Sequence, residues 1–223
     1  MSKPRTSNDL LYQLDADLSW RRHELSELHS VIKSSDEARA NVLTRALIPL
    51  LYAHFEGYIR FCILKYFQYL ETLGLPYSDL ERQIYINSFL KKTKSMFGAG
   101  ANLISISGHI DEIISSQHNR CTHVDSSLVD ARSNLNSNVL KELCYLCSLD
   151  YGDFLKHELF LDKFLLSRRN SIAHGEEIYL SSRNVKGESE VKKFIDQTLE
   201  MMLLFKASVS SKVAEKKYLC SSK

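Results

Sequence analysis

Residues 36–72 form the stretch that most restricts how this chain can fold. On a helix, their apolar side chains cover most of the circumference and not a single stripe. They include Leu47, Leu50, Leu51, Phe55, Tyr58, Ile59, Cys62, Ile63, Tyr66, Phe67 and Leu70. The apolar run is interrupted by Pro49, His54, Glu56, Gly57 and Arg60, so it is shorter than the roughly 18 residues that a membrane helix needs. The pattern predicts a buried central helix and no membrane span.

Other helices are predicted on both sides of this one by apolar residues at helical spacing. They cover 8–33, 82–97, 138–149, 154–174 and 188–217. Segments 73–81 and 176–187 are predicted loops, and Gly175 is well placed to end the preceding helix. The chain contains only 8 Gly and 3 Pro, which favours helices over the frequent turns of a β sandwich. We therefore expect one all-α domain over 1–223, with four to five main helices.

Residues 98–137 depart from this regular pattern. They are mostly polar, and their apolar residues keep a regular spacing only over short stretches. They predict only one helix, at 109–118. We interpret this segment as an irregular insertion that precedes the helix at 154–174.

Composition restricts the class of protein. The formal net charge of +2 is too small to indicate nucleic-acid binding by itself, so any basic surface must be local. The five cysteines have irregular spacing and do not indicate a disulfide framework, and residues 1–20 contain no apolar signal core. These features predict a cytoplasmic protein.

The sequence RRNSIAHGE, residues 168–176, combines groups that can cleave RNA without a metal. The imidazole of His174 can transfer protons near neutral pH, and a guanidinium can hold the negative charge of a phosphorane. Asn170 and His174, four residues apart, share a helical face. Arg169 lies about 140° from His174 around the helix, although its long side chain can still reach it. The alternative is a helix end whose basic last turn favours the macrodipole.

Four stretches of the chain resemble the HEPN superfamily in their order and spacing. They are YAHFEGYIR (52–60), SNLNSNVLKEL (133–143), DKFLLSRRNSIAHGE (162–176) and, within the last, the Arg-Asn-x-x-x-His motif. The resemblance implies a helical bundle and a metal-independent endoribonuclease of toxin or defence type that needs no cofactor. It further implies RNA as substrate, 2′,3′-cyclic phosphate and 5′-OH products, a homodimer with a composite cleft, and a neutralising antitoxin protein.

The same resemblance gives roles to the motif residues. Arg169 becomes the transition-state cation, Asn170 its polar partner, and His174 the base or acid. Arg168 permits an Arg-x5-His alternative, or it binds RNA phosphate. Two other functions stay open: a HEPN module that binds a nucleotide, RNA or a protein without turnover, and a helical protein-interaction domain.

Further polar groups lie on the central helix. Tyr52, Glu56 and Arg60 are spaced four apart and share one face. Glu56 can orient Arg169 or His174. Alternatively, Glu56 and Arg60 form a structural pair, and Gly57 admits a close helix crossing.

Three more clusters have a functional and a structural interpretation. Cys144 and Cys147 are expected to be buried small apolar residues, because no second pair completes a zinc site. A group of potential ligands, His118, Cys121 and His123, also lacks a fourth member, so no metal is predicted. Basic residues near Phe89 and Phe97 form either an RNA-backbone patch or a solvated face; they are Lys91, Lys92 and Lys94.

Overall fold

The computed structural model describes residues 2–98, 100, 102–124, 129, 134–176 and 188–220, and these residues form a helical protein. Its helices are α1 (Ser7–Ser34), α2 (Glu37–Leu73), α3 (Arg82–Gly98), α4 (Leu103–Ser115), α5 (Ser137–Leu146), α6 (Ser167–Ala173) and α7 (Glu188–Ala214). Short 3-10 segments lie at Tyr77–Asp79, Ser116–His118 and Gly152–His157, and a π-helical segment lies at Phe160–Leu166. The described residues contain only two isolated β-bridges and no strand. The all-α prediction is confirmed.

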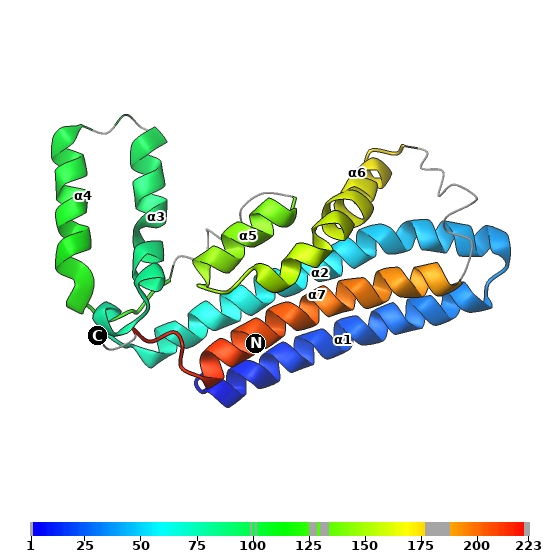
Figure 1. Cartoon of the computed structure of the whole chain (residues 1–223), viewed down its shortest axis with the longest axis horizontal. Coiled ribbons are helices and arrows are strands. Elements are labelled where there is room, and N and C mark those ends of the chain that lie inside the picture. Colours follow the sequence, from blue (N-terminus) through cyan, green and yellow to red (C-terminus); the bar gives the residue numbers. More distant parts are fainter. Residues whose placement is uncertain are drawn as a thin grey trace.

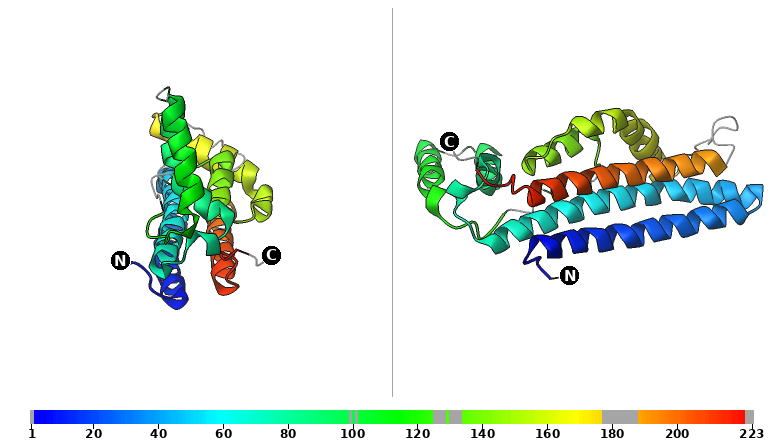
Figure 2. Two further views of the ribbon diagram at one scale, coloured as in Figure 1. Left: turned by 90° about the vertical axis from the view of Figure 1, so that its left-hand side faces the viewer. Right: turned by 60° about the horizontal axis from the view of Figure 1, so that its bottom comes forward.

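Three long helices form the body of the molecule. Helices α1, α2 and α7 run side by side, while α5 and α6 lie along one side of this bundle (Figures 1 and 2). The α3–α4 hairpin projects from one end, and α6 lies toward the other end with α5 between them (Figure 1). This arrangement separates the basic residues of α3 from those of α6.

Local signals fix the ends of the two longest helices. The Thr6 hydroxyl accepts a hydrogen bond from the Asp9 N–H, and the Asp9 carboxylate accepts one from the Thr6 N–H, which forms a capping box for α1. Asp36 caps α2 by accepting from the Arg39 N–H. Gly74 ends α2 at φ +57°, a left-handed conformation that glycine adopts without strain.

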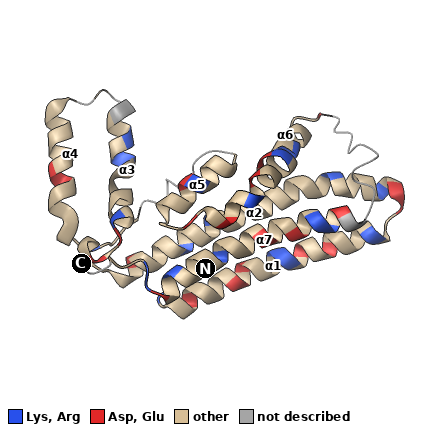
Figure 3. Ribbon diagram, viewed as in Figure 1, with Lys and Arg blue, Asp and Glu red and all other residues tan. Residues whose placement is uncertain are grey.

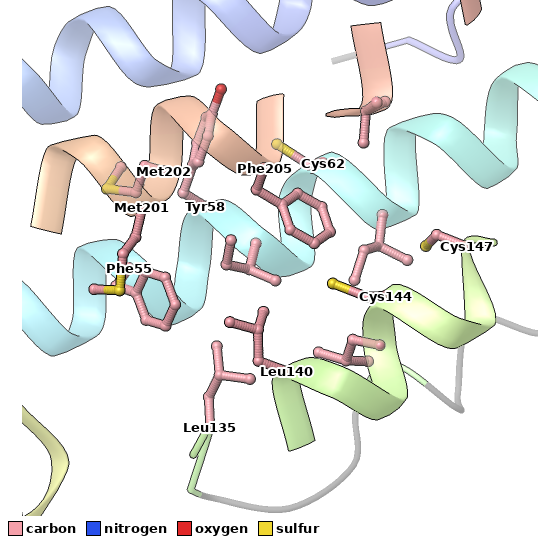
Figure 4. Packing of buried hydrophobic residues seen from close by; sticks show 14 of the residues in the cluster. Phe55, Tyr58, Cys62, Leu135, Leu140, Cys144, Cys147, Met201, Met202 and Phe205 are labelled. Carbon is pink, nitrogen blue, oxygen red and sulfur yellow. The ribbon is translucent and has the colours of Figure 1, made fainter. Parts of the chain in front are cut away.

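Helix α2 supplies the centre of the hydrophobic core. Phe55 and Tyr58 of α2 pack with Phe205 of α7, while Leu140 and Cys144 of α5 close the core from the other side (Figure 4). Helix α2 is long and apolar enough to cross a membrane, but the core helix of a soluble protein meets the same two criteria. In this fold, 56% of its most apolar window is buried. The predicted role of α2 as the central helix agrees with this packing.

A buried polar cluster joins α1 to α2. Arg21 Nε donates to Asp17 at 2.6 Å, and Arg21 Nη1 donates to the His54 carbonyl at 3.2 Å. A Cβ atom on Gly57 would lie only 3.0 Å from Arg21 Nη1. Gly57 therefore admits the Arg21 guanidinium between the helices, whereas the structural interpretation expected it to admit a close helix crossing.

The predicted insertion at 98–137 contains more helix than expected. Helix α4 begins at Leu103, six residues before the expected start, because Asn102 caps it by accepting from the Ser105 N–H. Gly108 lies inside α4, where a glycine costs about 1 kcal/mol without ending the helix. The expectation of a helix only at 109–118 is therefore wrong.

The predicted helix at 154–174 is present as one continuous helical stretch, but it is not a regular α-helix throughout. The chain passes there through a 3-10 segment, a π-helical segment and the regular helix α6. Within the π-helical segment, the Asp162 carboxylate accepts from both the backbone N–H and the hydroxyl of Ser137, at 2.8 and 2.6 Å. These bonds tie the segment to the first turn of α5, a tertiary contact that periodicity does not report.

Candidate functional site

The end of α6 is fixed by backbone hydrogen bonds. The Gly175 N–H donates to the Ile172 carbonyl at 3.1 Å, and the Glu176 N–H donates to the Ser171 carbonyl at 3.0 Å. This pair of bonds, with Gly175 at φ +75°, is a Schellman motif. The prediction that the helix ends at Gly175 is confirmed, and His174 is the residue immediately before it.

His174 is exposed and lies on this hydrogen-bonded turn. A contact from α2 holds the same turn, because Arg45 Nη2 donates to the Glu176 carbonyl at 2.8 Å. Among the described residues the His174 side chain has no hydrogen bond or ion pair. Its imidazole is available to solvent and to a ligand.

Arg169 lies on the side of α6 that faces α2. Its guanidinium stacks over the Tyr52 ring, with Cζ 4.9 Å from the ring centroid, and Nη1 donates to the Asn170 side-chain oxygen at 2.7 Å. The Tyr52 hydroxyl accepts from the Leu135 N–H at 2.5 Å. Arg169 is half-buried. The Tyr52 ring and the Asn170 amide hold its guanidinium, which makes no other hydrogen bond or ion pair with the described residues.

Tyr52 is kept neutral by its surroundings. Burial raises its pKa to about 12, the Leu135 N–H and the charge of Arg169 oppose this rise, and the Glu56 carboxylate adds to it by charge and hydrogen bonding. A neutral ring with a fixed hydroxyl gives Arg169 a stable platform.

Glu56 contacts Tyr52 and Arg60. Its carboxylate lies 3.8 Å from Arg60 Nη1, and it interacts with the Tyr52 hydroxyl. Within the described part of the chain it pairs with neither Arg169 nor His174. Tyr52 is the residue that contacts both Glu56 and Arg169.

Arg168 lies on a different side of α6. Its Cζ atom is 5.1 Å from the Phe164 ring centroid and 5.5 Å from that of Phe194 on α7. Its Nη1 is buried and has no hydrogen-bond partner among the described residues. Successive residues of a helix point about 100° apart, so the two neighbouring arginines extend toward different helices.

Phe164 and Phe194 are site residues that the sequence analysis missed. No short motif joins them, because Phe194 of α7 lies 30 residues after Phe164 in the sequence. The available signal was the spacing of four from Phe164 to Arg168, which usually marks one helical face.

The end of α6 carries the kinds of side chain that acid–base chemistry on a phosphodiester needs. They are an exposed imidazole and a half-buried guanidinium on one short helix, with Asn170 between them in sequence. Among the described residues Arg169 and His174 do not contact each other directly. A bound phosphate would have to bridge them.

A family model described as RiboL-PSP-HEPN matches residues 16–211. The chain belongs to this family. The match extends from α1 to the last turns of α7 and confirms the resemblance to the HEPN superfamily, which indicates a nuclease or another RNA-related function. It covers Arg169, Asn170 and His174 without giving them roles. No match was found among curated proteins or among solved structures.

The basic residues of α3 lie apart from the motif in this HEPN fold. Figure 3 shows them on the projecting hairpin, separated from those of α6. Lys92 pairs with Glu112 of α4, and Phe89 packs against Tyr85 and His109, with ring centroids 5.2 and 6.1 Å away. Lys91 and Lys94 are exposed, and the side chain of Phe97 lies outside the described residues.

The cysteine and histidine clusters of the HEPN chain do not assemble into a metal centre. Cys144 and Cys147 are fully buried, and burial raises the pKa of both thiols, that of Cys144 to about 12; their interpretation as buried apolar residues is confirmed. Cys121 is buried, whereas His118 and His123 are exposed. In the part of the chain that the structure describes, no group of three or more His, Cys, Asp or Glu could hold a metal ion.

Proposed function

We propose that this HEPN protein is a metal-independent endoribonuclease that cuts RNA by attack of a 2′-OH on the adjacent phosphate. One observation carries the proposal. The exposed imidazole of His174, on a backbone turn that hydrogen bonds hold, follows the same short helix that carries Arg169 against the Tyr52 ring. The family match supports an RNA-related function for this chain.

The chemistry follows from these residues. His174 takes the proton of the 2′-OH, and the freed O2′ attacks phosphorus. Arg169 stabilises the negative charge of the phosphorane, and Asn170 keeps the guanidinium oriented through its side-chain oxygen. The bond from phosphorus to O5′ then breaks, and O5′ receives a proton. The products are a 2′,3′-cyclic phosphate and a 5′-OH.

We further propose that the active form is a homodimer. In one turnover a single His174 cannot easily act both as the base toward the 2′-OH and as the acid toward the leaving O5′, because these oxygens lie on opposite sides of the phosphorus. Two His174 side chains across a twofold axis supply one base and one acid, and the acid gives O5′ its proton. A ribonuclease of this kind would harm its own cell, so a toxin or defence role with a neutralising antitoxin protein belongs to the same proposal.

The test uses the full chain and a 5′-labelled single-stranded RNA in EDTA. We expect cleavage, with products whose cyclic phosphate opens in acid. His174→Ala should lower the cleavage rate by about 10²-fold or more, while His118→Ala, at a matched exposed histidine at the hairpin end, should leave it unchanged. RNA binding without cleavage would show a binding module in place of a nuclease, and cleavage only after zinc or manganese is added would exclude the metal-independent route.

A further inference from the structure

A groove of about 580 Å³ lies between the π-helical segment and α7. Its lining combines basic and aromatic side chains: Lys156, Phe160, Phe164, Arg168, Lys193 and Phe194. Its volume falls within the roughly 300–1,000 Å³ of sites for small ligands. Tyr52 and Arg169 are not part of its lining.

The basic residues of the groove are only partly neutralised. Arg168 has a buried Nη1 without a hydrogen-bond partner in the described residues, and Lys193 is exposed and has no ion pair there. Lys156 donates to Glu200 at 2.8 Å. Among the described residues of the lining, Glu190 is the only acidic one. The groove therefore carries an excess of positive charge.

The aromatic residues provide an apolar floor and one accessible ring. Phe160 and Phe194 are buried, with centroids 6.1 Å apart. Phe164 is 39% exposed while it supports the Arg168 guanidinium. A planar base can stack on an exposed ring or on a guanidinium plane.

The π-helical segment explains why these side chains share the groove. Lys156, Phe160, Phe164 and Arg168 are spaced four apart along the chain. In a regular α-helix a period of four drifts by about 40° at each step. The wider turns of Phe160–Leu166 counteract this drift, and π-helical turns occur often at functional sites.

We propose that this groove binds one unpaired nucleotide of the RNA substrate, with the base against Phe164 and a phosphate facing Arg168 and Lys193. Aromatic rings beside cations are the features by which proteins hold single strands. Arg168 precedes His174 by six residues, about 9 Å along a helix, so the next nucleotides of a strand in the groove can reach the end of α6. This inference rests on the proposed function, for which it supplies a substrate-binding subsite.

The first test measures binding separately from cleavage. The ligand is a fluorescein-labelled single-stranded 2′-O-methyl RNA, which lacks the attacking hydroxyl and cannot be cut by the proposed route. Its fluorescence anisotropy is recorded with the full chain over a series of salt concentrations. Lys193→Gln should weaken binding and lower the salt slope by about 0.7, the value for one contact with a single strand. Lys192→Gln, an adjacent exposed lysine outside the groove, should change neither.

The second test addresses stacking. Phe164→Leu keeps an apolar side chain but removes the ring, and we expect about tenfold weaker binding. Tyr145→Leu removes a 63% exposed ring from α5, outside the groove, and should bind like the wild type. Both variants should show unchanged thermal unfolding, because Phe164 is partly exposed.

The outcomes separate the subsite from the nuclease. If wild-type protein cleaves RNA while Lys193→Gln and Phe164→Leu bind like their controls, the subsite is excluded and the nuclease stands. If the groove variants weaken binding of a chain that does not cleave, the subsite stands and the nuclease is excluded. A groove substitution that changes the oligomeric state in sedimentation without changing RNA affinity would identify a protein interface and overturn the inference.

Discussion

Arg21 and the arginine pair of α6 show two uses of the same side chain. Each of the three guanidinium groups lies over an aromatic ring, Arg21 over Trp20 at 4.6 Å. Arg21 is also paired with Asp17 and donates to a backbone carbonyl. Within the described residues, neither Arg168 nor Arg169 has a carboxylate partner.

Arg21 differs from Arg168 and Arg169 in whether its guanidinium N–H donors already have partners. Buried charge is stable only when it is paired and hydrogen-bonded, and Arg21 meets this condition between α1 and α2. Arg169 keeps one amide partner and Arg168 keeps an unpartnered N–H, both near the molecular surface. An arginine with unused donors is suited to an anion that arrives later, whereas a satisfied one belongs to the fold.

The largest expected effect is on Arg21. Arg21→Met leaves the Asp17 carboxylate buried without its cation, and we expect the free energy of unfolding to fall by about 3–5 kcal/mol, measured by urea denaturation. The double variant Asp17→Asn with Arg21→Met should recover part of this loss. A loss below about 1 kcal/mol would place Arg21 in the same class as the arginines of α6.

The next effect separates catalysis from stability. Arg169→Ala and His174→Ala should each lower the cleavage rate by about 10²-fold or more. Both variants should unfold at nearly the wild-type temperature, because neither residue belongs to the hydrophobic core. Variants that cleave like the wild type would show that the motif is only a helix end.

A smaller effect distinguishes the two arginines of α6. Arg168→Ala should weaken RNA binding and lower the salt slope by about 0.7, while the single-turnover rate at saturating protein stays near that of the wild type. Loss of cleavage in Arg168→Ala with normal cleavage in Arg169→Ala would exchange their roles.

His54, which lies beside Arg21, predicts a modest pH dependence of stability. Burial lowers the pKa of His54 from 6.5, although Glu24 opposes the shift, with Arg21 and Asp17 as the other charges of α1 near the ring. The unfolded chain therefore binds more protons, so stability falls as pH drops below 6.5. His54→Gln should reduce this slope by at most about 1.4 kcal/mol per pH unit. The slope will not vanish, since burial also lowers the pKa of His157. An unchanged slope in urea denaturation at several pH values would contradict the prediction.

The smallest effect is expected on the hairpin. Lys92 is already paired with Glu112, so Lys92→Gln should change the cleavage rate and the RNA affinity by no more than about twofold. A loss as large as that of Lys193→Gln would mean that RNA extends to α3.

Local patterns determined most of the helices. The period of apolar residues placed α1, α2, α3, α5 and α7 within a few residues of their observed ends, because a helix that packs on a core repeats its apolar face along the sequence. Gly175 marked the end of α6 for an equally local reason, since glycine adopts positive φ without strain.

Tertiary structure alone decided how the site is arranged. Sequence spacing treated 154–174 as one regular helix and left open which of Arg168 and Arg169 is the catalytic cation. The π-helical segment and the positions of α7 and α2 direct Arg168 to Phe194 and Arg169 to Tyr52. Lys92 of α3 also lies apart from α6, because its hairpin projects from the opposite end of the bundle (Figure 1). Contacts between segments far apart in the sequence have no period, so their outcome appears only once the helices are packed.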